Sequence, residues 1–161
     1  MRPKFIGFIL LIVLALILDQ CSSAKRDDSG SITNAGDVGA FEIQRGDCFD
    51  SLPNFDADGG TFSSLNAVPC NEAHHWEVFY QDSISLSSFA DDAVREEASA
   101  ICNSATERLI STMSSIKYDA FQSAELTYFA PTSKSWNSAG DRAVDCLIGS
   151  DVDTYFTSAI E

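Results

Sequence analysis

The sequence predicts an α+β domain in which one long helix packs on a small antiparallel sheet and two disulfides hold the fold together. Three observations lead to this prediction. Short segments with alternating apolar residues occur in both halves of the chain, one segment of helical period lies between them, and four cysteines fall in the same region. This order, in which a helix lies between two groups of strands, is typical of α+β folds.

The N-terminus has the layout of an export signal. Arg2 and Lys4 precede an unbroken apolar run over residues 5–18, and polar residues follow it. The run is shorter than the roughly 20 apolar residues of a membrane span. We therefore expect residues 1–24 to be a signal peptide or membrane anchor, with the rest of the chain outside the cytoplasm.

The mode of anchoring stays open at this point. Cys21 follows the apolar run and resembles the lipidated cysteine of a bacterial lipoprotein signal, which makes it the candidate lipidation residue. Gln20 departs from that pattern, which asks for a small residue before the cysteine. Cleavage after Ala24 would instead release a secreted protein, and an uncleaved anchor is the third alternative.

The charge of the chain limits its partners. The formal net charge is −14, and the part after residue 26 carries 6 basic and 23 acidic residues. Such a surface repels phosphate polymers and anionic headgroups. We expect no nucleic-acid partner, and membrane contact through the N-terminal segment only.

The segment that follows is rich in serine, aspartate and glycine and has no apolar period. Residues 25–39 are therefore predicted to be a flexible linker, and residues 40–161 the folded domain.

Three strands are predicted in the first half of the domain. Apolar and polar residues alternate over residues 41–44, and a second extended segment covers 66–70. The clearest strand covers 76–80. It carries apolar residues on both faces, so we expect it to lie in the middle of the sheet.

The predicted helix starts after Ser87 or Ser88, either of which can act as its N-cap. Asp91 and Asp92 fall in the first turn, where the helix dipole favours acids. Cys102 borders an apolar stripe of helical spacing. The stripe consists of Val94, Ala98, Ile101, Ala105 and Leu109.

Two further strands are predicted after the helix, over residues 126–130 and 144–148. Between them, residues 133–140 are expected to form a loop that holds Trp136. A marginal strand is predicted over 155–160.

The four cysteines of the domain predict two disulfides, because an even count in an oxidising compartment is typical of a disulfide framework. Three pairings are open. The layout favours Cys48–Cys70, which closes one loop, and Cys102–Cys146, which would join the helix to the last strand.

One group of residues has the chemistry of a metal or acid–base site. His74 or His75 with Glu77 could bind a metal or transfer protons. The plainer interpretation is that His74 makes hydrogen bonds in a turn and Glu77 is a packed or paired acid. We favour it, since these are the only two histidines, and we expect no cofactor.

Two other patterns have structural interpretations that we favour. Residues 54–59 match the first half of a calcium loop, but Leu65 stands where the closing glutamate belongs, which indicates a solvated turn. Trp136 with Asp141 and Arg142 is a candidate binding surface, although a loop tryptophan more often covers the edge of a core.

The chain from about Phe41 to Ile148 resembles the actinobacterial septum formation domain family. The following stretches carry the resemblance: Gly46-Asp47-Cys48-Phe49, Val68-Pro69-Cys70, His74, Glu77-Val78, Cys102, Tyr128-Phe129-Ala130-Pro131, Trp136, Gly140-Asp141-Arg142 and Val144-Asp145-Cys146. The resemblance implies an exported, membrane-anchored or lipoprotein-like protein linked to septum formation, with an envelope or division protein as partner. It attaches no enzymatic activity to the chain.

Two functions therefore remain. The favoured one is a non-catalytic extracytoplasmic binding or scaffold module. The alternative is an envelope enzyme or metal-dependent hydrolase that uses His74 and Glu77. Convergence of these two side chains in an open cleft would favour the enzyme, and burial of both would favour the module.

Overall fold

The computed structural model describes residues 23–53, 61–113 and 124–149. Residues 1–22 of the predicted N-terminal signal, the acidic segment 54–59 and the marginal strand at 155–160 lie outside the described residues. The elements are β1 (Lys25–Arg26), β2 (Ile32–Asn34), β3 (Gly36–Gly39), β4 (Cys48–Phe49), β5 (Ser64–Val68), β6 (Trp76–Ser83), α2 (Asp91–Thr112), β7 (Glu125–Phe129), α4 (Ser133–Ala139) and β8 (Ala143–Gly149). The last two residues of the predicted signal, Ser23 and Ala24, are described and lie beside Asp37 of β3.

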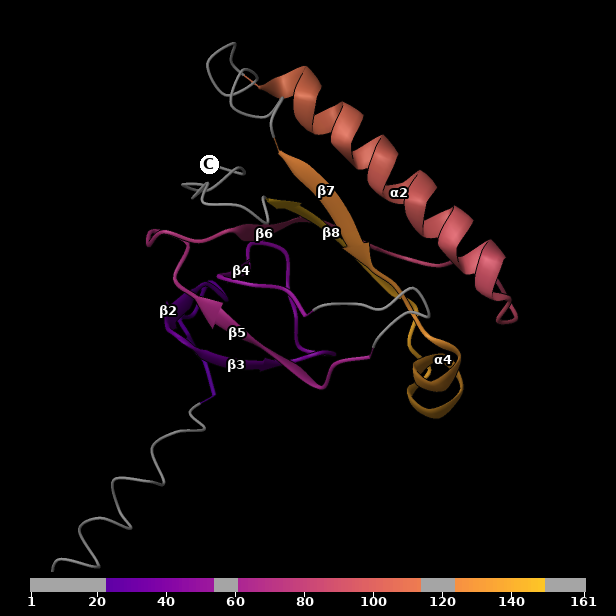
Figure 1. The fold of residues 1–161 in the computed structure, drawn as a ribbon, viewed down its shortest axis with the longest axis horizontal. Helices are drawn as coiled ribbons and strands as arrows, with labels where there is room; N and C mark the ends of the chain where they lie inside the picture. The colour runs from indigo at the N-terminus through magenta and orange to yellow at the C-terminus, as the bar shows by residue number, and fades with distance from the viewer. Residues whose placement is uncertain (1–22, 54–60, 114–123, 150–161) are drawn as a thin grey trace, which may run out of the picture.

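The fold is α+β, as the sequence predicts. Six strands form one curled antiparallel sheet in the order β3-β5-β4-β6-β8-β7, and the long helix α2 lies along the half of the sheet made by β6, β8 and β7 (Figure 1). Strands β1 and β2 form a separate two-stranded sheet beside β3 and β5 (Figure 1).

Strand β6 is central, because β4 pairs with one of its edges and β8 with the other. Its two faces enter different cores. Phe79 packs toward α2, whereas Trp76 and Val78 pack toward β3 and β5. Strand β8 divides its side chains in the same way, with Cys146 toward the helix and Leu147 toward the other core. Burial on both faces explains why apolar residues occur on both faces of β6 over residues 76–80 and make up most of β8.

Helix α2 buries one stripe against the sheet, formed by Val94, Ala98, Cys102 and Ala105. Its first turn contains Asp91 and Asp92 as expected. The predicted cap is wrong. Ala90 occupies the N-cap position, and no described side chain caps this end. The acids of the first turn favour the helix start through its dipole and pair with Arg95, so a serine cap is not required.

The segment predicted as a flexible linker, residues 25–39, is part of the folded domain. It forms β1, β2 and β3, and β3 pairs with β5 in the main sheet. Ile32 and Val38 are buried in the core on that side. Only these two widely spaced apolar residues signal the strands, and the glycines and serines around them hide the pattern.

The strand predicted over residues 41–44 is instead a turn. The amide of Glu42 donates to the carbonyl of Gly39 at 2.8 Å, and this hydrogen bond reverses the chain after β3. Ile43 is buried, but Phe41 is 69% exposed. Alternation over four residues fits a turn as well as a strand, and here the turn prevails.

The loop predicted over residues 133–140 is the short helix α4. Thr132 and Ser135 form a reciprocal capping box: the Thr132 hydroxyl accepts from the Ser135 amide at 3.1 Å, and the Ser135 hydroxyl accepts from the Thr132 amide at 3.0 Å. Gly140 ends the helix in the left-handed conformation at φ 68°, which glycine adopts without strain. Serine takes the place of the usual glutamate in the box, so the helix start is poorly marked in the sequence.

Both predicted disulfides are confirmed. Cys48–Cys70 has a Cα–Cα distance of 5.4 Å and closes a sequence separation of 22. Cys102–Cys146 has a Cα–Cα distance of 5.5 Å and a separation of 44. The second bond joins α2 to β8 and thereby holds the helix on the sheet.

Candidate functional site

The site residues predicted from sequence meet around the first disulfide. Strands β4 and β6 pair so that Cys48 lies opposite Glu77. The chain between Cys70 and His75 then returns to the sheet, where the His75 amide donates to the Phe49 carbonyl at 3.1 Å. This return places His74 beside the strand pair. One potential ligand atom from each of Cys48, His74 and Glu77 lies within 4.8 Å of the others.

This group, the Cys48–His74–Glu77 cluster, is sealed from solvent. Cys48 and His74 are 0% exposed and Glu77 is 1% exposed. Two shallow hollows flank helix α2 and are lined by residues of α2, β6 and β7, but none of the cluster residues lines either hollow. The cluster is therefore convergent but closed, which is the arrangement of a structural site rather than of an open cleft.

His74 makes one hydrogen bond that fixes its tautomer. Its Nδ1 lies 2.8 Å from the carbonyl oxygen of Glu72. Since a carbonyl can only accept, Nδ1 carries the proton. The turn hydrogen bond expected for His74 is thus present. The other ring nitrogen, Nε2, is buried and has no hydrogen-bond partner among the described residues.

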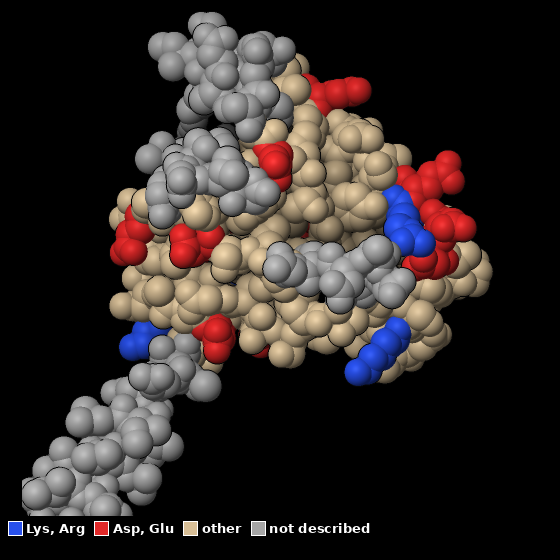
Figure 2. Space-filling model, viewed as in Figure 1, with Lys and Arg blue, Asp and Glu red and all other residues tan. Residues whose placement is uncertain are grey.

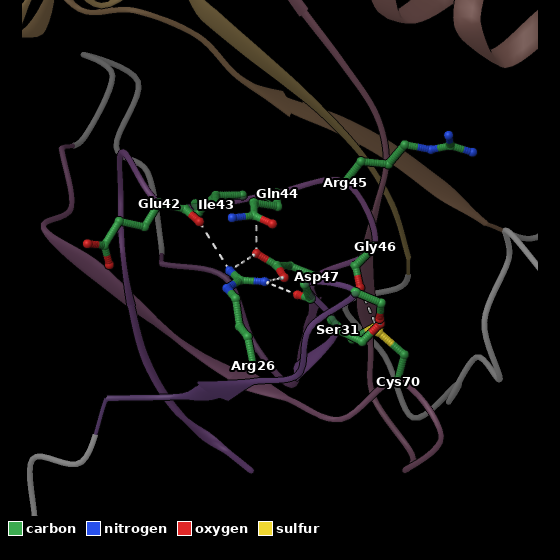
Figure 3. Close-up of polar contacts among 12 residues, drawn as sticks. Arg26, Ser31, Glu42, Ile43, Gln44, Arg45, Gly46, Asp47 and Cys70 are labelled. Atoms are coloured by element: carbon green, nitrogen blue, oxygen red, sulfur yellow. Dashed lines mark hydrogen bonds and ion pairs between the residues drawn. A yellow bond between two sulfur atoms is a disulfide. The ribbon is translucent and has the colours of Figure 1, made fainter. Parts of the chain in front are cut away.

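A charge pair missed by the sequence analysis lies next to the cluster. The Arg26 guanidinium binds the Asp47 carboxylate at 2.5 and 2.8 Å, and Figure 3 shows the two groups facing each other. Asp47, which is 1% exposed, also accepts from the Gln44 amide at 2.8 Å. The hydrogen bonds that Arg26 donates to the Asp47 carboxylate raise the pKa of Arg26 above its usual value. Arg26 lies in the segment predicted to be a linker, and a partner 21 positions away in the chain leaves no local signal in the sequence.

A second buried acid lies on β8. Asp145 is 5% exposed and accepts from Gln81 Nε2 at 2.5 Å. Burial raises the pKa of Asp145 to about 6, and the nearby charges of Asp141 and Asp47 add to this effect, while the Gln81 hydrogen bond opposes it. A carboxyl group with this pKa changes charge within the physiological pH range.

Trp136 lies in α4 and is only 5% exposed. Phe89 contacts it edge-on with 5.7 Å between ring centroids, and the Arg142 guanidinium stacks 3.3 Å from its ring centroid. Asp141 accepts from the Ala143 amide at 3.0 Å and thus helps to start β8. This burial agrees with the interpretation that Trp136 covers a core edge. A role of the three residues in binding a partner stays a prediction.

The surface agrees with the acidic composition. Figure 2 shows acidic side chains at several places over one face of the molecule, with few basic ones between them. Exposed acids come from different elements, for example Asp37 of β3, Asp82 of β6 and Asp92 of α2.

No protein-family model, curated protein or solved structure matches this chain. Within the described residues, no helix combines the length and the apolar character that crossing a bilayer requires.

Proposed function

We propose that the chain is a non-catalytic extracytoplasmic module of the cell envelope that binds or holds another protein. One observation carries this proposal: the side chains with the strongest catalytic character, His74 and Glu77, are sealed beneath the surface at 0% and 1% exposure. A hydrolase needs its acid and base within hydrogen-bond reach of a substrate. The closed cluster supports a role in holding the fold.

The two disulfides support a location outside the cytoplasm, because such bonds persist in oxidising compartments. Membrane anchoring through the N-terminal segment is the finer part of the proposal and rests on the apolar run and Cys21. A link to septum formation rests on the resemblance described above. The partner on this proposal is an envelope or division protein.

Two exposed apolar side chains are the first places to look for a partner. Phe41, in the turn after β3, is 69% exposed, and Leu126, on the edge strand β7, is 46% exposed. Apolar anchors of protein–protein contacts come from such positions, and single exposed apolar side chains are also normal on protein surfaces, so the experiment below decides.

Site-specific photocross-linking in living cells tests the proposal. A photoreactive amino acid is placed at Phe41 or at Leu126 of the full chain, and at exposed Thr33 as a matched control. We expect a discrete protein adduct from at least one apolar position and none from Thr33. The combined change His74→Gln and Glu77→Gln should leave the adduct intact per folded molecule. Absence of adducts together with a hydrolytic activity that this double change removes would overturn the proposal in favour of the enzyme.

A further inference from the structure

The Cys48–His74–Glu77 cluster contains more metal-binding chemistry than a structural histidine requires. Sulfur, imidazole nitrogen and carboxylate oxygen are all ligands of Zn²⁺ in proteins. The three ligand atoms lie within 4.8 Å of one another. A fourth potential ligand is the sulfur of Cys70, which is bonded to the Cys48 sulfur at 2.00 Å.

The orientation of His74 is an independent observation that points to a ligand. Its Nδ1–H is held by the Glu72 carbonyl at 2.8 Å, while Nε2 is completely buried without a hydrogen-bond partner among the described residues. Metal-binding histidines in proteins have this arrangement: one ring nitrogen donates to a carbonyl and the other faces the metal. A buried ring nitrogen without a partner costs free energy unless something binds it.

We propose that Cys48, Cys70, His74 and Glu77 form a redox-gated zinc site. In the oxidised chain the disulfide occupies the two sulfurs. In the chain reduced at this bond, two thiolates, His74 Nε2 and the Glu77 carboxylate bind one Zn²⁺ in a closed tetrahedral site. Ligand atoms of such a site lie about 3.5 Å apart, so those of Cys48, His74 and Glu77, now within 4.8 Å of one another, need to move closer by roughly an ångström. The Cys70 sulfur is free to turn toward them once the disulfide is reduced.

The reduction has a defined route. Cys48 is 0% exposed, whereas Cys70 is partly exposed, so a dithiol reductant attacks the Cys70 sulfur and Cys48 leaves as the thiolate. The second thiol of the reductant then releases Cys70. Overall, two electrons and two protons pass to the protein, and the reductant becomes a disulfide. Binding of Zn²⁺ displaces the two thiol protons into solvent.

The surroundings of Cys70 suit both states. Its sulfur lies 3.0 Å from the carbonyl oxygen of Gly46, and Figure 3 shows the two groups together. A half-cystine carries no proton, so in the oxidised chain this is a contact and not a hydrogen bond. After reduction the thiol of Cys70 can donate to the same oxygen until the metal replaces its proton.

Cobalt titration of the full chain tests the proposal. The chain, purified in mild detergent with Cys21→Ser so that only the four domain cysteines remain, is reduced under anaerobic conditions and titrated with Co²⁺. We expect one Co²⁺ per chain, with a thiolate-to-cobalt charge-transfer band and the visible bands of tetrahedral Co²⁺, which Zn²⁺ then abolishes. The unreduced chain should give neither band.

Matched variants identify the ligands. The pair Cys102→Ser and Cys146→Ser should keep the bands after reduction, whereas Cys48→Ser with Cys70→Ser should remove them. His74→Gln should weaken Co²⁺ binding at least about 10-fold, because the imidazole is a direct ligand. Bands that survive the Cys48 and Cys70 changes, or equal binding by His74→Gln, would overturn the proposal.

A second measurement needs no variant. If Zn²⁺ protects Cys48 and Cys70 of the reduced wild-type domain from alkylation while Cys102 and Cys146 react, mass spectrometry of the labelled peptides supports the site. Equal labelling of all four cysteines with and without Zn²⁺ contradicts it. The inference is independent of the proposed function, because a scaffold without partners in the cross-linking experiment could still bind the metal.

Discussion

Asp145 is a buried carboxyl group whose ionisation opposes folding. Its folded-state pKa is about 6, against 3.8 for the unperturbed group, and the main cause is burial. A raised carboxyl pKa means that the folded state binds the proton more tightly than the unfolded state. The protonated carboxyl group therefore makes its full contribution to the free energy of unfolding below about pH 4. That contribution is lost as the pH rises through about 6.

We expect Asp145→Asn to stabilise the domain at pH 7.5 by about 1–3 kcal/mol, given about 1.4 kcal/mol for each pKa unit. The difference from wild type should shrink toward zero at pH 4.5, where Asp145 is protonated. Thermal unfolding of both proteins at the two pH values measures this. If Asp145→Asn were instead less stable than wild type by the same amount at both pH values, the loss of the Gln81 hydrogen bond would outweigh the relief of the buried charge.

Gly149 is required by the close approach of two strands. It pairs with Trp76 across β6 and β8, and a Cβ at this position would collide with the carbonyl oxygen of His75 and would lie 2.6 Å from Trp76 Cδ2. Backbone cannot move aside as a flexible side chain can. We expect Gly149→Ala to cost about 1–3 kcal/mol in urea denaturation.

Gly39→Ala is the matched control, since its Cβ would meet only the flexible carboxylate of Glu42, 3.2 Å away. Its effect on the free energy of unfolding should be within about 0.5 kcal/mol. If Gly149→Ala and Gly39→Ala lowered the free energy of unfolding by similar amounts, the loss would come from replacing a glycine as such and not from the close contact between β6 and β8.

At the scale of elements, the sequence predicts those whose apolar pattern is dense. Strand β6 and helix α2 each have many buried residues at regular spacing, and both were located correctly. Strands β1 to β3 were missed because they contain few apolar residues and depend on pairing with β5 and on one ion pair. Long-range contacts of this kind have no local period. Leu126 shows the converse: it fits the alternation of β7 but is 46% exposed.

The Arg26–Asp47 ion pair links β1 to the segment just before β4, and we expect it to contribute to the stability of the domain. Arg26→Ala leaves the Asp47 carboxylate buried without its cation, so we expect a loss of about 3 kcal/mol. Lys25→Ala, one residue away and exposed, should change stability by less than about 0.5 kcal/mol. Urea denaturation of both variants measures this, and equal effects would mean that Arg26 contributes no more than a surface charge.

At the scale of the whole molecule, the candidate site was predictable only in part. The cysteine count gives two disulfides, and His74 and Glu77 are visible as chemically capable residues. Their convergence with Cys48 depends on the register of β4 against β6, in which Cys48 lies opposite Glu77. A single sequence does not contain that register. It also does not show whether a convergent cluster is open or sealed, because burial is set by the loop that returns from Cys70.

The two disulfides differ in what they hold, and this predicts different consequences of losing each. Cys102–Cys146 closes a sequence separation of 44, which is twice the 22 of Cys48–Cys70. Because the longer loop removes more entropy from the unfolded chain, we expect Cys102–Cys146 to stabilise the domain by about 0.6 kcal/mol more than Cys48–Cys70 does. It is also the covalent bond between α2 and the sheet. Replacing both of its cysteines with serine should therefore cost about 4 kcal/mol.

This loss should appear first in the helix. Hydrogen exchange of the Cys102→Ser, Cys146→Ser variant is expected to accelerate in residues 91–112, while β4, β5 and β6, which stay joined near Cys48–Cys70, remain protected. The Cys48→Ser, Cys70→Ser variant should show the reverse. Uniform acceleration in both variants would mean that the domain opens only as a whole, and that the second disulfide stabilises it without acting specifically on the helix.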